Sequence, residues 1–290
     1  MNVDTTTESR GRIPVELGPV QETLLIPLLG RAEETKKPGG ALRDDKAVAI
    51  VEALDYDFGK WAGHDALVGS AVRARLFDAE VEAFLVAHPA GTVVEIGAGL
   101  NTRYERLGNG RAQWLELDLP DSTALRRRFF EDTERRTIIA GSALEDDWFE
   151  AVRARPGPVC FVAEAVLIYL DAERLEVALR RLARAFPGAW LVTDTASSRM
   201  LERQEHSIMN TLPKESWFRW PCDDPAALAA WGWELVHSKS FVDAPPEIRA
   251  VMPGKYRVLL ALVPWLMRRV VGGYRINRFV ARGAAEGGAA

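Results

Sequence analysis

Residues 92–107 read TVVEIGAGLNTRYERL, and this stretch decides the fold. The run VVEI favours a buried strand, GAG favours a tight turn, and the polar residues that follow are compatible with a helix. Glycine has no Cβ, so at Gly97 and Gly99 the chain can turn sharply and a ligand can lie directly on the backbone. The amide groups at the start of the following helix face such a ligand. The stretch therefore predicts a strand, a glycine turn and a helix that together bind a small molecule.

Strands and helices alternate on both sides of this stretch. Besides the strand at 93–96, strands are expected at 113–117, 137–140, 159–163, 190–193 and 234–241, and a last one at 273–280. Helical patterns lie between them at 102–107, 121–130, 145–154 and 171–186. This alternation predicts an α/β fold, Rossmann-like, with a mostly parallel sheet that helices cover on both faces.

Helices also precede the sheet, and an irregular insertion interrupts it. Residues 1–20 are mostly polar and aperiodic, so we expect a flexible N-terminus there. Patterns at 20–29, about 44–54 and 67–88 predict an N-terminal helical extension, with a charged loop at 33–40. Residues 197–225 are polar and aromatic and fall between the fifth and sixth strands, which predicts a lid over the carboxyl ends of the strands. Residues 21–290 are therefore expected to form a single domain with this substrate-binding insertion.

Composition argues against several classes of function. The chain has 290 residues, is 48% hydrophobic and carries a net charge of −4. A weakly acidic chain is poorly suited to binding nucleic acid, so no such partner is expected. The longest apolar run, 258–271, is interrupted by charged residues and a proline and is too short to span a bilayer, so no membrane partner is expected. The polar N-terminus lacks the apolar segment of a signal peptide.

Cysteine and histidine usage predicts neither a disulfide framework nor a metal site. Cys160 lies in an apolar run and Cys222 is far from it in sequence, so the reducing cytoplasm is the expected location. No pair of the four histidines has the spacing of metal ligands on a helix. Clusters of arginine at 126–128, 135–136, 180–181 and 268–269 are expected mostly on solvated helix faces.

An acidic residue follows the second strand and indicates a nucleoside ligand. Asp118 ends the run WLELD about 20 residues after the glycines, where a carboxylate can accept both hydroxyls of a ribose. NAD and S-adenosylmethionine proteins share this spacing. A dinucleotide fingerprint has a third glycine where this chain has Thr102. That difference favours a ligand without a pyrophosphate, such as S-adenosylmethionine. The alternative is that Asp118 serves only as a helix cap or a turn residue.

The run EIGAGLNTRYERL resembles the signature E/N-x-G-A-G-x-D-T-R-x-x-R-L of the leucine carboxyl methyltransferase (PPM-type) family. Within that family the chain looks most similar to polyketide O-methyltransferases of the tetracenomycin type. The segments VRARLFDAEVEAFL, WLELDLP, IIAGSALEDDW and AEAVLIYLDAERL also resemble the family, in the right order, over about residues 30–180. The resemblance implies a class I methyltransferase sheet and S-adenosylmethionine as the cofactor. The chain departs from the signature at Asn101, where the family has aspartate.

The resemblance also implies which residues bind the cofactor. By position, Arg73 meets the carboxylate of the cofactor, Asp118 its ribose and Glu164 its amino acid group. Arg73 as a solvated helix residue, and Glu164 as a member of a structural ion pair, remain alternatives. Ser142 and Ala143 match the pair beside adenine, where the family often has Asp-Leu. The full set of expected cofactor-binding residues is Arg73, Glu95, Gly97, Gly99, Asp118, Ser142, Ala143 and Glu164.

The resemblance further implies methyl ester formation on a carboxylate, of a small polyketide-like acid or of a protein C-terminus. A carboxylate is ionised at neutral pH and needs no general base, whereas a phenol usually does. No histidine or acid stands out as a dedicated base, which favours a carboxyl acceptor. Tyr169 either packs in the core or positions the acceptor. Residues suited to a flat aromatic acid, or alternatively to lid packing, are Trp217, Arg219, Trp220 and Arg275.

The sequence alone leaves two other functions possible. One is an NAD-dependent oxidoreductase, which Thr102 disfavours. The other is a binding protein that retains the fold without catalysis. The expected partner is a small carboxylic acid, and the expected state is a monomer or a homodimer.

Overall fold

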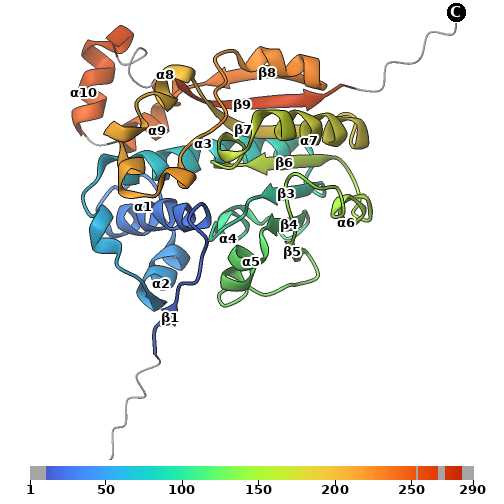
Figure 1. The fold of residues 1–290 in the computed structure, drawn as a ribbon, viewed down its shortest axis with the longest axis horizontal. Coiled ribbons are helices and arrows are strands. Elements are labelled where there is room, and N and C mark those ends of the chain that lie inside the picture. Colours follow the sequence, from blue (N-terminus) through green and yellow to red (C-terminus); the bar gives the residue numbers. More distant parts are fainter. Residues whose placement is uncertain (1–10, 253, 267–271, 283–290) are drawn as a thin grey trace, which may run out of the picture.

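A central sheet organises the computed structural model, which describes residues 11–252, 254–266 and 272–282 (Figure 1). The seven strands of this sheet lie side by side in the order β5-β4-β3-β6-β7-β9-β8. Their bounds are β3 Thr92–Ile96, β4 Gln113–Asp118, β5 Arg136–Ala140, β6 Val159–Ala163, β7 Trp190–Ala196, β8 Trp233–Lys239 and β9 Tyr274–Ala281. The alternation of apolar runs therefore placed the strands correctly, with β7 three residues longer than expected.

The sheet is mostly parallel, as predicted for an α/β fold. Strands β3 to β7 pair in parallel, and β9 lies antiparallel between β7 and β8. Strand β3 is hydrogen-bonded to β4 on one side and β6 on the other, so the chain order reverses there. In open α/β sheets a ligand binds at such a reversal, beyond the carboxyl ends of the strands. The glycine turn follows β3 at this point.

Helices cover both faces of the sheet, and alternate strand residues supply the two cores. Val93 and Cys160 pack on the α3 side, whereas their neighbours Val94 and Phe161 pack on the α7 side. This alternation follows from the two-residue period of a strand. The helices that surround the strands are α3 Asp65–Ala87, α4 Arg103–Leu107, α5 Pro120–Arg126, α6 Phe149–Arg153 and α7 Ala172–Ala185.

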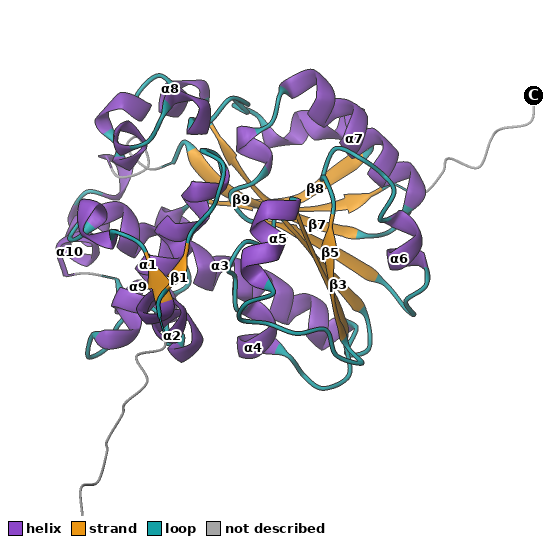
Figure 2. Ribbon diagram, turned by 60° about the horizontal axis from the view of Figure 1, so that its bottom comes forward, coloured by secondary structure: helices purple, strands orange, loops and turns teal. Residues whose placement is uncertain are grey.

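The N-terminal helices lie to one side of the sheet in both ribbon views (Figures 1 and 2). They comprise η1 Gln21–Leu24, α1 Leu25–Lys36, α2 Asp45–Ala53 and η2 Phe58–Trp61. Asp44 caps α2 by accepting the amide of Ala47 at 2.9 Å. The expected loop at 33–40 is wrong at its start, because α1 continues to Lys36 and its Glu34 is buried.

Hydrogen bonds hold residues 13–18 in a defined conformation. Strand β1, Ile13–Pro14, pairs in parallel with β2, Leu54–Asp55, and the amide of Gly18 donates to Asp121 at 3.1 Å. The expectation of a flexible stretch at 1–20 is therefore wrong for 13–18, and residues 1–10 lie outside the described part. A strand of two residues is too short to give a recognisable pattern in the sequence.

The segment expected to form a lid consists of short helical turns. These are α8 Ser198–Leu201, η4 Gln204–His206, η5 Ile208–Thr211 and η6 Lys214–Ser216. The remaining short elements are η3 Leu167–Tyr169, η7 Pro225–Trp231, η8 Phe241–Asp243 and α9 Pro246–Val251. Whether the segment opens and closes stays a prediction.

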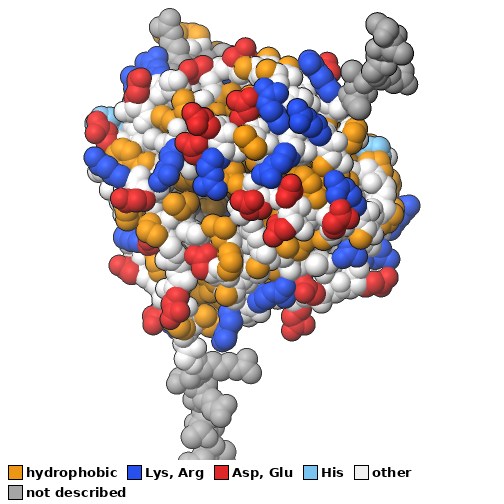
Figure 3. Space-filling model, turned by 45° about the vertical axis from the view of Figure 1, so that its right-hand side comes forward, with side chains coloured by type: hydrophobic (Ala, Val, Ile, Leu, Met, Phe, Trp, Pro, Cys, Tyr) orange, Lys and Arg blue, Asp and Glu red, His pale blue; other side chains and the backbone are white. Residues whose placement is uncertain are grey.

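Helix α10, Gly254–Leu262, lies at the periphery (Figure 1). Val258, Leu262 and Trp265 are exposed, so this part of the apolar run does not lie in the core. Residues 267–271 of the run lie outside the described part. Among the described residues no helix is both long enough and apolar enough to cross a membrane. On the face shown in Figure 3, acidic and basic side chains are intermixed.

Candidate active site

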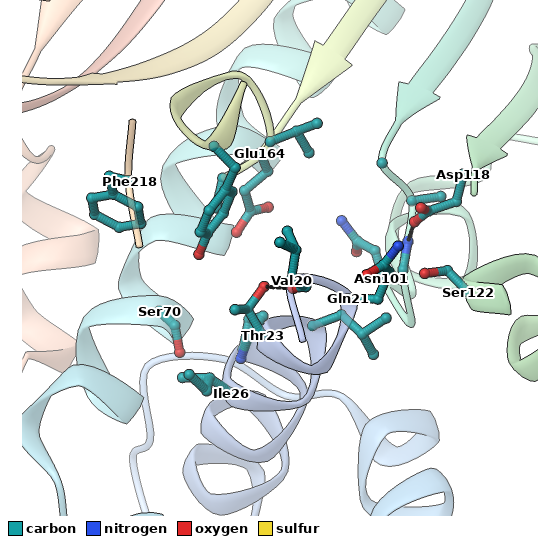
Figure 4. A pocket seen from close by; sticks show the side chains of 18 of the residues that line it. Val20, Gln21, Thr23, Ile26, Ser70, Asn101, Asp118, Ser122, Glu164 and Phe218 are labelled. Carbon is teal, nitrogen blue, oxygen red and sulfur yellow. Dashed lines mark hydrogen bonds between the residues drawn. The ribbon is translucent and has the colours of Figure 1, made fainter. Parts of the chain in front are cut away.

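A crevice of about 590 Å³ opens at the carboxyl ends of the parallel strands. The loops after β3, β4, β5 and β6 line one wall, and helices α1 and α3 and residues 200–218 line the other. Its volume falls within the range of small-molecule sites, about 300–1,000 Å³. In Figure 4, Asp118 and Ser122 lie at one end, Phe218 and Ser70 at the other, and Glu164 between them. We call these the ribose end and the acceptor end.

The glycine turn forms the floor of the crevice. Gly97 and Gly99 have φ angles of 67° and 48°, in the left-handed region that favours glycine. A Cβ on Gly97 would lie 2.3 Å from Cγ2 of Val166, so this position accepts no side chain without movement. The amides of Gly97 and Ala98 both donate to the carbonyl of Leu117, at 2.8 and 3.0 Å. The turn is thus fixed to β4 and keeps its backbone open to the crevice.

Two buried arginines hold the turn from behind. Arg126 donates from Nη1 to the carbonyls of Gly99 and Asn101, at 2.9 and 2.8 Å. Arg31 donates to the carbonyl of Leu100 at 2.8 Å. The expectation that the cluster at 126–128 is a solvated face is wrong for Arg126, which is almost fully buried, and it is likewise wrong for the buried Arg136 in the cluster at 135–136. Three successive carbonyls of the turn are therefore occupied by guanidinium groups.

Asp118 fixes the ribose end. Its Oδ2 accepts the amide of Gly99 at 2.6 Å, and its Oδ1 accepts the amide of Leu119 at 2.7 Å. A carboxylate has about four acceptor positions, so both oxygens can still accept hydroxyl groups from the crevice. Burial raises the pKa of Asp118, against the two amide hydrogen bonds. The hydroxyl of Ser122 is buried at the same end and has no partner among the described residues.

A network of buried ions lies beneath the middle of the crevice. Glu164 accepts from Nε of Arg73 at 2.9 Å and from Nη2 of Arg103 at 2.6 Å. Arg103 also contacts Glu95 and Asp78, at 2.7 and 2.9 Å. Burial alone would raise the pKa of Glu164, but the two arginines bring it below its usual range. Glu164 is thus held as a carboxylate at the crevice wall, and Arg73 lies in the site rather than in solvent.

The residues after β5 extend the crevice beyond the ribose end. Ser142 and Ala143 line it, as expected, together with Gly141. The carbonyl of Ser142 accepts from Nε1 of the buried Trp148 at 3.1 Å, which fixes the turn. Glu95 also lines the crevice, but both its oxygens accept from Arg103, so it acts on the site through that arginine.

The acceptor end is mostly apolar. Tyr169 and Phe218 pack edge to face with ring centres 5.2 Å apart, and Met209 and Ile26 lie nearby in the lining. Burial raises the pKa of the Tyr169 phenol to about 12, against a hydrogen bond with Thr23. Tyr169 is therefore uncharged at neutral pH and can donate a hydrogen bond into the crevice.

The insertion contributes different residues from those expected. The four residues expected to bind substrate lie outside the lining of the crevice: Trp217, Arg219, Trp220 and Arg275. Two of them are structural: Trp217 donates to the carbonyl of Met209 at 2.8 Å, and Trp220 is buried in the core. The other two side chains are exposed. Phe218 faces the crevice instead, because buried Gln204 bonds both its amide and its carbonyl, at 2.6 and 3.1 Å.

Sequence reasoning missed two further residues of the acceptor end. Asp194 is fully buried in β7, and Tyr274 at the start of β9 donates its hydroxyl to it. A buried aspartate in the strand LVTD was the available signal, but the expected strand ended one residue before it. No group of three or more His, Cys, Asp or Glu side chains in residues 11–252, 254–266 and 272–282 is arranged to hold a metal ion.

The crevice fits S-adenosylmethionine. The backbone of the turn at Gly97 and Gly99 lines the crevice and can lie against the methionine part, and Asp118 has acceptor positions left for a ribose. Glu164 can accept an ammonium group, and Arg73 beside it can donate to a carboxylate. Of the described residues that line the ribose end, Leu119, Ser122 and Asn101 carry no positive charge that could hold a pyrophosphate.

Comparisons with known proteins relate the chain to methyltransferases. The family model for leucine carboxyl methyltransferases matches residues 25–183. Tetracenomycin polyketide synthesis O-methyltransferase TcmP from Streptomyces glaucescens is 28% identical over 251 residues, 83% of this chain and 92% of the relative. The S-adenosyl-L-methionine-dependent methyltransferase dpfgK from Gibberella zeae is 29% identical over 59% of this chain and 63% of its own. Among solved structures, the CurJ carbon methyltransferase superposes with a TM-score of 0.52 at 16% identity, over 91% of this chain and 68% of that one, which shows a shared fold.

Proposed function

Because the chain belongs to the leucine carboxyl methyltransferase family and is a methyltransferase dependent on S-adenosylmethionine, we propose that it methylates a carboxylate oxygen of a small aromatic or polyketide-like acid. The observation that carries the proposal is one crevice with two unlike ends. Asp118 and the glycine turn form a polar end suited to a nucleoside, and Phe218, Met209 and Ile26 line an apolar end suited to a flat acceptor.

Each part of the chain has a defined task when the cofactor is bound. S-adenosylmethionine supplies a methyl group on a sulfonium, which is already electrophilic. Asp118 accepts the ribose hydroxyls, Glu164 accepts the ammonium group, and Arg73 donates to the carboxylate. The glycine turn, held by Arg126, keeps the backbone close enough for the ligand to lie on it. The chain thereby fixes the donor, and catalysis depends on holding the acceptor oxygen in line with it.

A carboxylate acceptor suits this apolar end for a reason of charge. A carboxyl group with a pKa of about 4 is ionised at neutral pH, so its oxygen is a nucleophile without help from a base. Tyr169 can donate a hydrogen bond that positions it, since its own phenol stays protonated. The relation to a tetracenomycin polyketide O-methyltransferase supports a polyketide-like acid as the acceptor. We place the reaction in the cytoplasm, because Cys160 and Cys222 are both free thiols.

Methyl transfer from labelled S-adenosylmethionine tests the proposal directly. The acceptor panel contains aromatic acids, the corresponding phenols and peptides with a free C-terminus. We expect label in the aromatic acids, released by mild base as a methyl ester releases it. Label in peptides alone would favour a protein C-terminus as the acceptor, and no label in any acid would contradict the proposal.

We expect Asp118→Ala and Arg73→Ala each to weaken S-adenosylmethionine binding roughly tenfold or more, the usual loss when a charged hydrogen bond is removed. Isothermal calorimetry gives the affinity, and circular dichroism checks that each variant is folded. Asp132→Asn is the matched control, because Asp132 also accepts a backbone amide, that of Ile138 at 2.6 Å, but lies outside the crevice. Unchanged affinity in both folded variants would refute the assignment of the site.

A further inference from the structure

Asp194 is a buried carboxylate to which carboxyl methylation assigns no role, because a carboxylate acceptor needs no general base. It is fully buried in β7, and its two oxygens accept the amide of Ala165 at 3.0 and 2.9 Å. Ala165 has a φ of 53°, which a residue with a Cβ rarely adopts. Residues held in such conformations cluster at functional sites. The loop after β6 is thus bent so that one amide, next to Glu164 in the chain, faces Asp194.

Tyr274 connects this carboxylate to the crevice. Its ring lines the acceptor end and stacks on Phe241, with ring centres 5.9 Å apart and an angle of 26°. Its hydroxyl donates to Oδ2 of Asp194, and its oxygen accepts a long hydrogen bond from Nη1 of Arg73 at 3.4 Å. A phenol has one proton to donate and its oxygen can also accept. Because the proton of Tyr274 points at Asp194 and Arg73 uses one lone pair, the second lone pair of the oxygen can accept a proton from an acceptor hydroxyl in the crevice.

We propose that Tyr274 and Asp194 form a proton relay that lets the same crevice methylate a phenolic or enolic hydroxyl, a second acceptor class beside carboxylates. The inference rests on the proposed function, since both activities use one cofactor site. The acceptor oxygen forms its bond to the methyl carbon while the carbon–sulfur bond breaks, and the sulfur keeps the electron pair. The hydroxyl proton passes to the oxygen of Tyr274, and the proton of Tyr274 passes to Asp194. The products are the methyl ether, the demethylated cofactor and a protonated Asp194.

The charges around Asp194 suit a proton acceptor. Burial raises its pKa to about 6, although Arg73 and the hydrogen bond from Tyr274 oppose the rise. Glu164, on the other side of Arg73, contributes to the rise as a like charge. A group with such a pKa is ionised at neutral pH and yet more basic than an ordinary aspartate. A general base works best when its pKa lies near the working pH.

Matched acceptor pairs separate this activity from the carboxyl activity. The probes are 2-naphthoic acid and 2-naphthol, with one-ring and three-ring pairs of the same kind. We expect the wild type to methylate both classes. Tyr274→Phe and Asp194→Asn should lower kcat for the phenols about 100-fold or more, the usual contribution of a general base, and should lower the ratio of phenol to acid kcat by a similar factor. Asparagine can still accept from Ala165 and Tyr274, and phenylalanine can still stack on Phe241.

The pH profile gives a readout that a purely structural role would not give. Only ionised Asp194 can take the proton, so wild-type kcat for phenols should fall as the pH drops through about 6. The acids are ionised down to about pH 4, so their kcat should stay level over that range. Calorimetry with S-adenosylmethionine checks that each variant still binds the cofactor. Tyr56→Phe is the matched control, because Tyr56 donates to the carboxylate of Glu22 outside the crevice.

Each other outcome has a definite meaning. A wild type that methylates acids but no phenol overturns the inference and leaves the proposed function standing. Unchanged phenol methylation in the variants, or an equal loss for both acceptor classes, also overturns it, because the pair would then be structural. A wild type that methylates neither class contradicts the proposed function itself.

Discussion

An Arg103→Met variant is expected to lose about 3–5 kcal/mol of unfolding free energy, the usual cost of removing one partner from a buried ion pair. Arg103 is almost fully buried beneath the crevice and contacts Asp78, Glu95 and Glu164. Methionine fills a similar volume, but it brings no positive charge, so the negative charges of the three carboxylates are less well compensated. Most of the lost stability should come from Glu95. The other two carboxylates keep a partner, because Asp78 still contacts Arg106 at 2.8 Å and Glu164 still contacts Arg73.

Urea denaturation followed by circular dichroism measures this loss. The control is Arg43→Ala, because Arg43 pairs with Asp45 at a similar distance, 3.0 Å, but both side chains are exposed. Exposed pairs contribute about 0.2–1 kcal/mol, so the control should change little. If Arg103→Met costs no more than Arg43→Ala, the buried network does not stabilise the fold.

A second substitution identifies the carboxylate responsible. Burial raises the pKa of Glu95, against the pull of Arg103, so Glu95 carries the least compensated charge once the arginine is gone. Glu95→Gln removes that charge and keeps the shape of the side chain. The double variant Glu95→Gln with Arg103→Met should therefore be more stable than Arg103→Met alone. Additive losses would place the cost elsewhere in the network.

The sheet could be predicted from the sequence because its strands are short, apolar and bounded by turn residues. The glycine turn and Asp118 could be placed for a related reason: both follow directly from strand ends. Parallel strands bring their carboxyl ends to one edge, so residues there share a crevice without any knowledge of side-chain contacts. The structure adds that Glu164 and Arg73 meet at 2.9 Å across the same crevice.

The buried arginines could not be predicted, because burial of an ion depends on its partners. Arg126 is the last residue of the short helix α5 and the first of a run of three arginines, a pattern typical of a solvated surface. It is buried because Glu116 in β4 pairs with it at 2.5 Å and the carbonyls of the glycine turn accept from it. Glu116 itself lies between Leu115 and Leu117 in β4, and a charged residue between these apolar neighbours was a trace of the pairing in the sequence.

The residues that line the acceptor end were predicted wrongly for two reasons: the alternation of side chains along a strand and the irregular backbone of the insertion. Tyr274 and Arg275 are neighbours in β9, so they point to opposite faces and only one can reach the crevice. The sequence favoured the charged residue, but Tyr274 lies inside and Arg275 is exposed. In the insertion, Trp217 and Phe218 follow no helical or strand period. The direction of Phe218 depends on the hydrogen bonds of Gln204, which lies fourteen residues before it, and that of Trp217 on its bond to the carbonyl of Met209.

Gly97→Ala is expected to cost about 1–2 kcal/mol for the left-handed backbone and about 1–3 kcal/mol more for overpacking against Val166. The first term comes from a φ of 67°, and the second from a Cβ placed 2.3 Å from Cγ2 of Val166. Both act at the surface where the cofactor lies, so S-adenosylmethionine affinity should also fall, by about tenfold or more. Thermal unfolding and calorimetry measure the two effects separately.

Two variants divide the cost of Gly97→Ala between its causes. Gly188 has a φ of 78° and nothing within 4 Å of an added Cβ, so Gly188→Ala carries the backbone term alone. Val166→Ala removes the methyl groups that meet the new Cβ, so the double variant Gly97→Ala with Val166→Ala should recover the overpacking term and part of the cofactor affinity. A coupling between the two sites is expected because they are in contact. Equal losses for Gly97→Ala and Gly188→Ala would show that Val166 yields to a side chain at this position, and close packing against Val166 would no longer explain why glycine stands there.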